Sequence, residues 1–210
     1  MILPGATLGV LGGGQLGRMF ALRARVMGYR VAVLEPDPRS PAGQVADEQI
    51  EAAYDDADAL ALLADRCAAV TTEFENVPAQ ALAWLAERVP VHPSPAAVAV
   101  TQERGAEKSF LRDHGFATAA FAPVRSADDV EAAVASVGLP ALLKTARLGY
   151  DGKGQAPVRS VEEGRAAFER LGGVACILER RLSLECEVSV VLARGADGAV
   201  APFPVGENEH

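Results

Sequence analysis

Short apolar runs alternate with amphipathic stretches through the N-terminal half of the chain. Apolar runs at 7–11, 30–35 and 68–75 predict buried strands. Between and after them, three- and four-residue spacing of apolar residues predicts helices at 16–27, 57–67 and 78–89. Strands that alternate with helices are typical of a parallel, doubly wound sheet, so an α/β fold is predicted here.

The first helix of this pattern carries large apolar residues. Leu16, Met19, Phe20 and Val26 are predicted to form its buried side. Farther along, Ser94 followed by Pro95 predicts a helix start, because serine caps helices and proline suits the first turn. The region 101–108 is the predicted boundary between two parts of the chain.

The second part has a different order of elements. Ser126 with Asp129, and Ser160 with Glu163, have the spacing of capping boxes and predict two helix starts, the first helix ending at Gly138. Apolar runs predict strands at 140–146, 175–182 and 185–195. A turn at 196–198 precedes a further strand-like run at 199–205.

Composition narrows the class of protein. Half of the 210 residues are apolar and the net charge is −8, which argues against general binding to nucleic acid or to anionic membranes. The three cysteines form no CxxC pair, which favours a reduced, cytoplasmic protein over a disulfide scaffold or a zinc site. No signal peptide and no membrane span are predicted.

A glycine-rich turn follows the first predicted strand. Gly12, Gly14 and Gly17 form G-x-G-x-x-G, and the acidic Glu35 follows about 20 positions later, as in NAD-binding proteins. Amides at a helix N-terminus favour any anion, so the motif indicates phosphate more directly than NAD. A purely structural turn is the alternative.

Two other stretches carry candidate chemistry. Glu73 and Glu75 follow the third strand, where open α/β sheets place ligand-binding groups, although a solvated acidic turn has the same pattern. In "LLKTARLGYDGKGQ", residues 142–155, Lys144 ends an apolar strand and three glycines follow. Such a loop can cover phosphates, with Lys144 and Lys153 neutralising charge; it is no Walker A loop, and an ordinary surface loop is the alternative.

The last candidates lie in "ILERRLSLECEVSV", residues 177–190. Glu179, Glu185 and Glu187 suit hydroxyl recognition or metal binding, and ordinary strand-end charges explain them equally well.

Taken in order, these pieces resemble one family. "GGGQLGRM", "TEFENVP", Arg104 with Lys108, "GYDGKGQ", "LERRLSLECEVSV" and "PVGENEH" are similar to the N5-carboxyaminoimidazole ribonucleotide synthases, ATP-grasp ligases of purine biosynthesis. The resemblance implies a Rossmann-like pre-ATP-grasp domain at 1–103. It implies the first lobe of an α+β ATP-grasp domain at 104–182 and the incomplete start of the second lobe at 183–210.

The resemblance implies a reaction and its ligands. ATP phosphorylates bicarbonate to carboxyphosphate, and the carboxyl group then passes to the amine of 5-aminoimidazole ribonucleotide. The implied ligands are ATP, Mg²⁺, bicarbonate and this ribonucleotide, in a cytoplasmic and homodimeric enzyme that binds neither nucleic acid nor membrane.

Site residues follow from the same resemblance. ATP is expected to contact Arg104, Lys144, the loop Gly149, Tyr150, Asp151, Gly152, Lys153, Gly154 and Gln155, the segment Glu179, Arg180, Arg181 and Leu182, and also Glu187 and His210. The ribonucleotide is expected at Gly14, Gln15, Leu16 and Glu73. Tyr150, Asp151 and Lys153 are expected to border the reacting groups.

Family members continue well beyond this length, so the chain is expected to be a truncated, inactive form with its Mg²⁺ ligands beyond residue 210. A formate-dependent glycinamide ribonucleotide formyltransferase and an NAD-dependent oxidoreductase are the alternative enzymes. A non-catalytic binding or assembly fragment is a third alternative. Glu35 has no assigned role outside the NAD alternative.

Overall fold

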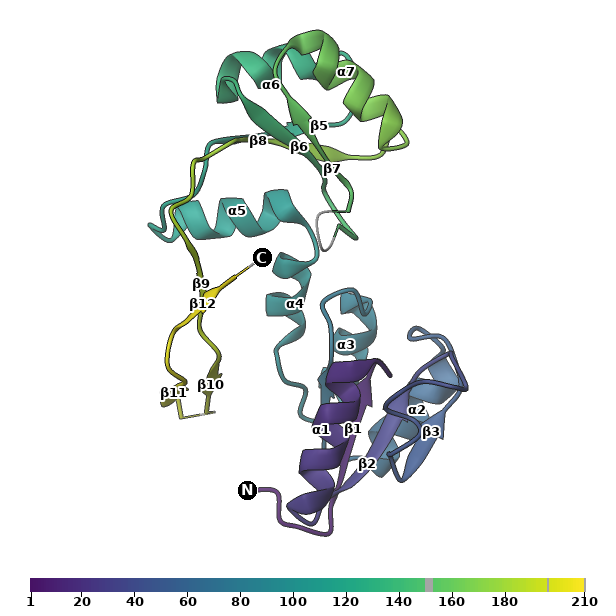
Figure 1. Cartoon of the computed structure of the whole chain (residues 1–210). Coiled ribbons are helices and arrows are strands. Elements are labelled where there is room, and N and C mark those ends of the chain that lie inside the picture. Colours follow the sequence, from purple (N-terminus) through teal and green to yellow (C-terminus); the bar gives the residue numbers. More distant parts are fainter. Residues whose placement is uncertain (150–152, 196, 210) are drawn as a thin grey trace.

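A computed structural model describes residues 1–149, 153–195 and 197–209, and two sheet-based units joined by two helices dominate it (Figure 1). The first unit contains strands β1 (Thr7–Leu11), β2 (Arg30–Leu34), β3 (Glu48–Ile50) and β4 (Ala69–Thr72), with helices α1 (Gln15–Val26), α2 (Ala57–Arg66) and α3 (Ala79–Ala86). Only the short β3 was not predicted from the apolar pattern.

The first sheet is parallel throughout, in the order β3-β2-β1-β4. Alternate residues of its strands face opposite sides, as in any pleated strand. Val10, Val31 and Val33 pack with α1, whereas Leu11 and Leu34 belong to the core formed with α2 and α3. Helices therefore cover both faces, and the predicted doubly wound sheet is confirmed.

Helix α1 buries a different side from the predicted one. Its buried residues are Gly17, Ala21 and Ala24, while Leu16, Met19 and Val26 are all more than 60% exposed. Small residues spaced four and three apart let the helix lie close against the sheet, and this turns the large apolar side chains outward. The prediction of a buried Leu16, Met19 and Val26 was wrong.

Two short helices join the units: α4 (Pro95–Thr101) and α5 (Arg104–Asp113). The hydroxyl of Ser94 accepts a hydrogen bond from the Ala97 amide at 3.2 Å, so the predicted helix start is confirmed. The break between α4 and α5 falls inside the range 101–108. The domain boundaries themselves stay predictions.

The second unit contains β5 (Phe121–Val124), β6 (Ala141–Thr145), β7 (Gln155–Val158) and β8 (Cys176–Arg180), with α6 (Asp129–Val137) and α7 (Val161–Arg170). Its sheet has the order β5-β8-β6-β7, and all three pairings are antiparallel. Helices α6 and α7 pack on one face, and α5 lies on the other side (Figure 1).

The two predicted capping boxes have different outcomes. The Ser160 hydroxyl accepts from the Glu163 amide at 3.2 Å and caps α7 as expected. At α6 the N-cap is Asp128, and the Ser126 hydroxyl makes no such cap. The Asp129 carboxylate instead accepts from the Arg125 and Ser126 amides, each at 2.8 Å, and these bonds lower its pKa.

The last segment forms two separate antiparallel pairs, β9 (Glu187–Ser189) with β12 (Gly206–Asn208) and β10 (Leu192–Arg194) with β11 (Val200–Pro202). The single strand predicted at 185–195 is therefore wrong. It divides because its two halves pair with different partners. The described residues from 181 to 207 are all exposed, in contrast to the buried β8 that precedes them.

Candidate functional site

The turn between β1 and α1 is closed by the chain's own carboxylates. The Gly13 amide donates to Glu35 at 2.8 Å and the Gly14 amide donates to Glu73 at 2.7 Å. The Gly17 amide also donates to Glu73. Glu35 follows β2 and Glu73 follows β4, so the strands on either side of β1 each supply one acceptor. The carboxylates also complement the positive end of the helix dipole.

Glycines are required in this turn because the glutamates lie directly against it. A Cβ on Gly13 would lie 2.4 Å from Glu35 Cγ, and one on Gly12 would lie 2.5 Å from Glu73 Cγ. Gly12 also has a φ of 108°, which side chains rarely adopt. The turn and the two glutamates therefore form one packed unit.

Glu35 serves this unit rather than a dinucleotide ribose. Its carboxylate accepts from the Gly13 amide, the Asp37 amide and the Tyr54 hydroxyl. Burial, followed by the hydrogen bond to Glu35, raises the pKa of Tyr54, so Tyr54 remains a donor. The acidic residue that completed the NAD pattern thus has a different function in the fold.

Two backbone donors remain at the start of α1. The first-turn amides of any α-helix have no partner within the helix, and here Glu73 engages that of Gly17. Gln15 and Leu16 supply the other first-turn donors, and both residues are exposed. Both were predicted beside the ribonucleotide phosphate, and Glu73 lies at the same helix end.

A charged cluster occupies the α5 face of the second sheet. The Lys144 ammonium on β6 lies 2.9 Å from Glu179 on β8, and the Lys108 ammonium on α5 lies 3.6 Å from the same carboxylate. Glu179 is only 6% exposed. Two lysines against one carboxylate leave an excess positive charge, which suits a phosphate ligand.

Lys108 was quoted in the family motif but was not among the expected site residues. The signal in the sequence was its position four residues after Arg104, because that spacing places two side chains on one side of a helix.

Arg104 anchors the second glycine-rich loop. Its amide donates to the Ala146 carbonyl at 2.9 Å, and its guanidinium donates to the Gly149 carbonyl at 2.8 Å. At the far end of the loop the Thr145 amide donates to the Gly154 carbonyl at 2.8 Å. Arg104, Gly149 and Gly154 are thus brought together. Lys153 is exposed, and Gln155 pairs with Lys144 in the sheet.

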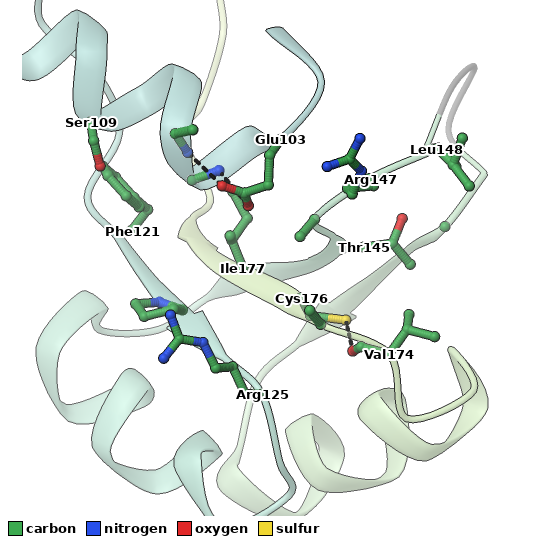
Figure 2. A pocket seen from close by; sticks show the side chains of 16 residues that line it. Glu103, Ser109, Phe121, Arg125, Thr145, Arg147, Leu148, Val174, Cys176 and Ile177 are labelled. Carbon is green, nitrogen blue, oxygen red and sulfur yellow. Dashed lines mark hydrogen bonds between the residues drawn. The ribbon is translucent and has the colours of Figure 1, made fainter. Parts of the chain in front are cut away.

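A cavity of about 750 Å³ lies between α5, the sheet and this loop (Figure 2). Phe121, Ile177, Leu148 and Val174 supply apolar surface, and Arg125 and Arg147 lie at its edge. Phe121 pairs with Glu179 and Ile177 pairs with Lys144, so the cavity and the charged cluster share one face of the sheet. An apolar wall beside cations can hold a purine ring with attached phosphates.

Other expected ATP residues lie at the end of β8 and beyond. The Arg180 and Arg181 amides donate to the carbonyls of Ala120 and Pro140 at 2.8 and 3.0 Å, so both residues remain joined to the sheet. Leu182 is exposed, and Glu187 at the start of β9 accepts from Asn208 at 2.9 Å. Tyr150, Asp151, Gly152 and His210 lie outside the described residues.

A second, smaller cavity of about 360 Å³ lies where the two units meet. Glu75 and Asn76 come from the turn after β4, Gln102 and Arg104 come from the joining helices, and Gly149 comes from the glycine-rich loop. Sequence motifs from both units therefore border one space.

Known proteins contain the same two units in the same order. A family model described as a ribonucleotide synthetase preATP-grasp domain matches residues 5–102, and one described as an ATP-grasp domain matches residues 109–210. The N5-carboxyaminoimidazole ribonucleotide synthase of Brucella melitensis is 48% identical over 99% of this chain, which covers 58% of that relative.

Solved structures agree. The Staphylococcus aureus N5-carboxyaminoimidazole synthetase complexed with ADP superposes with a TM-score of 0.95 at 38% identity, over 100% of this chain and 56% of that one. The Aspergillus clavatus synthase in complex with ADP and 5-aminoimidazole ribonucleotide gives 0.83 at 27% identity, over 98% of this chain and 54% of that one. The chain spans little more than half the length of these proteins.

These findings confirm the predicted order of a pre-ATP-grasp unit followed by ATP-grasp elements. They give no support to the formyltransferase or the oxidoreductase alternative, and the closed glycine turn argues independently against the second. Over nearly its whole length the chain is similar to N5-carboxyaminoimidazole ribonucleotide synthases, and it combines a preATP-grasp region with an ATP-grasp region.

Proposed function

We propose that this chain supplies ATP-binding and ribonucleotide-binding surfaces for the carboxylation of 5-aminoimidazole ribonucleotide. A bicarbonate oxygen attacks the γ-phosphorus of ATP, which gives carboxyphosphate and releases ADP. The ribonucleotide amine then attacks the carbon of carboxyphosphate, and phosphate departs. Alternatively, carboxyphosphate first breaks down to CO₂ and phosphate, and the amine attacks the CO₂. The products are N5-carboxyaminoimidazole ribonucleotide, ADP and phosphate.

One observation carries this proposal. The turn after β4, which carries Glu73, contributes Glu75 and Asn76 to the cavity of about 360 Å³, and the loop expected to cover the ATP phosphates borders the same cavity at Gly149. A reaction that moves a group from a phosphate-activated intermediate to an amine needs both ligands close together, because proximity supplies much of the rate.

Individual residues support distinct roles. Lys144 and Arg104 neutralise ATP phosphates, and the loop 149–155, with Lys153, encloses the transferring phosphoryl group. Tyr150 and Asp151 are placed there by sequence alone. The residues from Glu179 to Leu182, at the end of β8 and just after it, line the adenine. Glu187 and His210 contact other parts of the nucleotide.

The ribonucleotide site rests on the start of α1. The amides of Gln15 and Leu16 suit its phosphate, because helix N-termini bind anions. Gly14 has no side chain, so the backbone can lie close to the ribonucleotide. The Glu73 carboxylate, which already accepts from Gly14 and Gly17, faces the imidazole ring.

Partners and location complete the proposal. Mg²⁺ accompanies ATP, and the protein acts as a homodimer in the cytoplasm. All three cysteines are free, as a reducing compartment favours. Within the part of the chain that the structure describes, no helix is both long and apolar enough to cross a membrane.

Nucleotide titration tests the proposal. We expect ATP with Mg²⁺ to raise the melting temperature of the chain and NADH to leave it unchanged. Lys144→Ala should weaken ATP binding by roughly tenfold or more, the effect of losing one charge-assisted hydrogen bond. Arg165→Ala, which removes a surface charge on α7, is the matched control. Stabilisation by NADH alone, or unchanged ATP affinity in Lys144→Ala, would contradict the assignment.

A further inference from the structure

A buried glutamine lies at the junction of the two units. Gln102 is the C-terminal cap of α4 and is only 7% exposed, although it is polar. A buried amide is costly unless its donors and acceptor are paired. Its partners therefore show what this position does.

The Gln102 side chain bonds to both units. Its amide nitrogen donates to the Glu75 carbonyl at 2.7 Å and to the Val77 carbonyl, both in the turn after β4. Its amide oxygen accepts from the Arg147 guanidinium at 3.1 Å. Both N–H groups and the oxygen are thus used, and this one side chain joins the turn after β4 with Arg147, which lies 45 residues after Gln102.

Arg147 lies within the glycine-rich loop, two residues from Gly149, which Arg104 holds. The loop therefore has two attachments to the joining segment 102–104. The Arg104 attachment belongs to the joining helix alone. The Gln102 attachment continues into the turn that carries Glu73, so it is the one that connects the loop with the turn.

We propose that Gln102 and Arg147 form a positioning link through which the turn after β4 and the glycine-rich loop sense each other's ligand. The proposal rests on the proposed function, which places the ribonucleotide at the turn and the nucleotide at the loop. Neither residue touches a reacting atom. Each holds the backbone of a segment that does.

The two ends of the link differ in strength. The Gln102 bonds to Glu75 and Val77 are buried, so breaking them leaves unpaired carbonyls. Arg147 is exposed and can exchange its partner for water at small cost. Loop movement should therefore break the Arg147 end, while the Gln102 end stays attached to the turn.

Ligand coupling in the 210-residue chain tests the link. ADP affinity is measured by calorimetry with and without saturating 5-aminoimidazole ribonucleotide. We expect the ribonucleotide to change the ADP dissociation constant about fivefold or more in the unmodified chain. In Arg147→Ala this ratio should fall to near one, whatever the affinity of the variant for ADP alone.

Hydrogen exchange without ligands gives a second readout. In Arg147→Ala, residues 146–149 should exchange faster while residues 75–77 keep their protection. In Gln102→Glu, which removes the donors but keeps the size, both segments should exchange faster. Arg159→Ala and Gln80→Ala, exposed residues of the same types, are the controls.

The outcomes separate the two proposals. Binding of neither ligand to the unmodified chain would contradict the proposed function, and exchange at 146–149 would still decide about the link. If both ligands bind and Arg147→Ala keeps the full coupling ratio, or if its exchange at 146–149 matches that of Arg159→Ala, the link is not real.

Discussion

The molecule contains two glycine-rich loops, and they are held in opposite ways. The first, after β1, is held from inside: Glu35 and Glu73 accept its amides and fill the space beside its glycines. The second, after β6, is held from outside: Arg104 and Gln102 bind its carbonyl at Gly149 and its side chain at Arg147. In the first loop the backbone amides of the loop donate to carboxylates, whereas in the second the Gly149 carbonyl accepts from Arg104 and the Arg147 guanidinium donates to Gln102.

This difference shows what a glycine pattern can and cannot indicate. A glycine indicates that some other group lies close to the backbone at that position. In the first loop that group is largely the protein's own carboxylates, and only the amides of Gln15 and Leu16 are left for a ligand. In the second loop, the described carbonyls of Gly149 and Gly154 accept hydrogen bonds from Arg104 and Thr145.

The sharpest test compares one alanine substitution in each loop. Gly12→Ala should destabilise the fold by about 3 kcal/mol or more, because its Cβ meets Glu73 Cγ at 2.5 Å and its φ is 108°. Gly154→Ala should cost about 1–2 kcal/mol, because the nearest described atom to its Cβ is the Thr145 hydroxyl oxygen, at 2.6 Å, and its φ is 71°.

Urea unfolding measures both values, and Gly5→Ala calibrates the cost of a positive φ alone, because nothing lies within 4 Å of its Cβ. Equal losses at Gly12 and Gly154 would mean that the first loop is no more tightly packed than the second.

A smaller effect should follow from weakening the carboxylate itself. Glu73→Gln keeps the shape but removes the charge at the start of α1, and its amide group can accept at only one oxygen. We expect a loss of about 1–2 kcal/mol in the free energy of unfolding. Glu75→Gln, on an exposed neighbour, should change it by less than about 0.5 kcal/mol. A neutral Glu73→Gln would show that the loop does not depend on the carboxylate.

The smallest effect concerns the cysteines beneath the two regions. Cys67 is buried next to β1, and Cys176 is buried where it lines the larger cavity. Burial raises the pKa of each thiol, that of Cys67 to about 12. Below pH 9 Cys67 is a neutral thiol both folded and unfolded. Between pH 9 and 12 the Cys67 thiol ionises more readily in the unfolded chain than in the folded one, so stability should fall as the pH rises through this range.

Cys67→Ala should reduce this pH dependence, to which Tyr54 and Cys176 also contribute, and alkaline denaturant titrations would detect the reduction. Thiol labelling at pH 8 should proceed in the order Cys186, which is exposed, then Cys176 through the cavity, then Cys67. Faster labelling of Cys67 than of Cys176 would contradict the tighter packing of the first region.

Local signals predicted much of the fold. Ser94, Ser160 and Gly138 act as the helix signals that their types suggest, and β1, β2, β4, β6 and β8 lie within the predicted apolar runs, whereas β3, β5 and β7 were not predicted. Such features depend on neighbours in sequence. The outward face of α1 could not be predicted in this way, because hydrophobicity favours Leu16 and Met19 as buried residues whereas close packing selected Gly17 and Ala21.

The same distinction between local and long-range features applies to the candidate site. Lys144, Glu73 and the glycine loops were predicted from motifs. The pairing of Lys144 with Glu179, the closure of the first loop by Glu35, and the bonds of Gln102 join residues that are far apart in sequence. Neither spacing nor residue type reveals which distant group will satisfy a buried donor, so these features required the structure.

The closed turn after β1 has a consequence for protein engineering. Converting this scaffold into a dinucleotide-dependent catalyst by grafting ribose contacts onto β2 would fail, since the loop would still present two carboxylates where a pyrophosphate must bind. Any such redesign must first replace Glu35 and Glu73 and then re-satisfy the amides of Gly13, Gly14 and Gly17 with the new cofactor. The glycine pattern therefore does not by itself mean that the amides of the turn are free to bind a ligand.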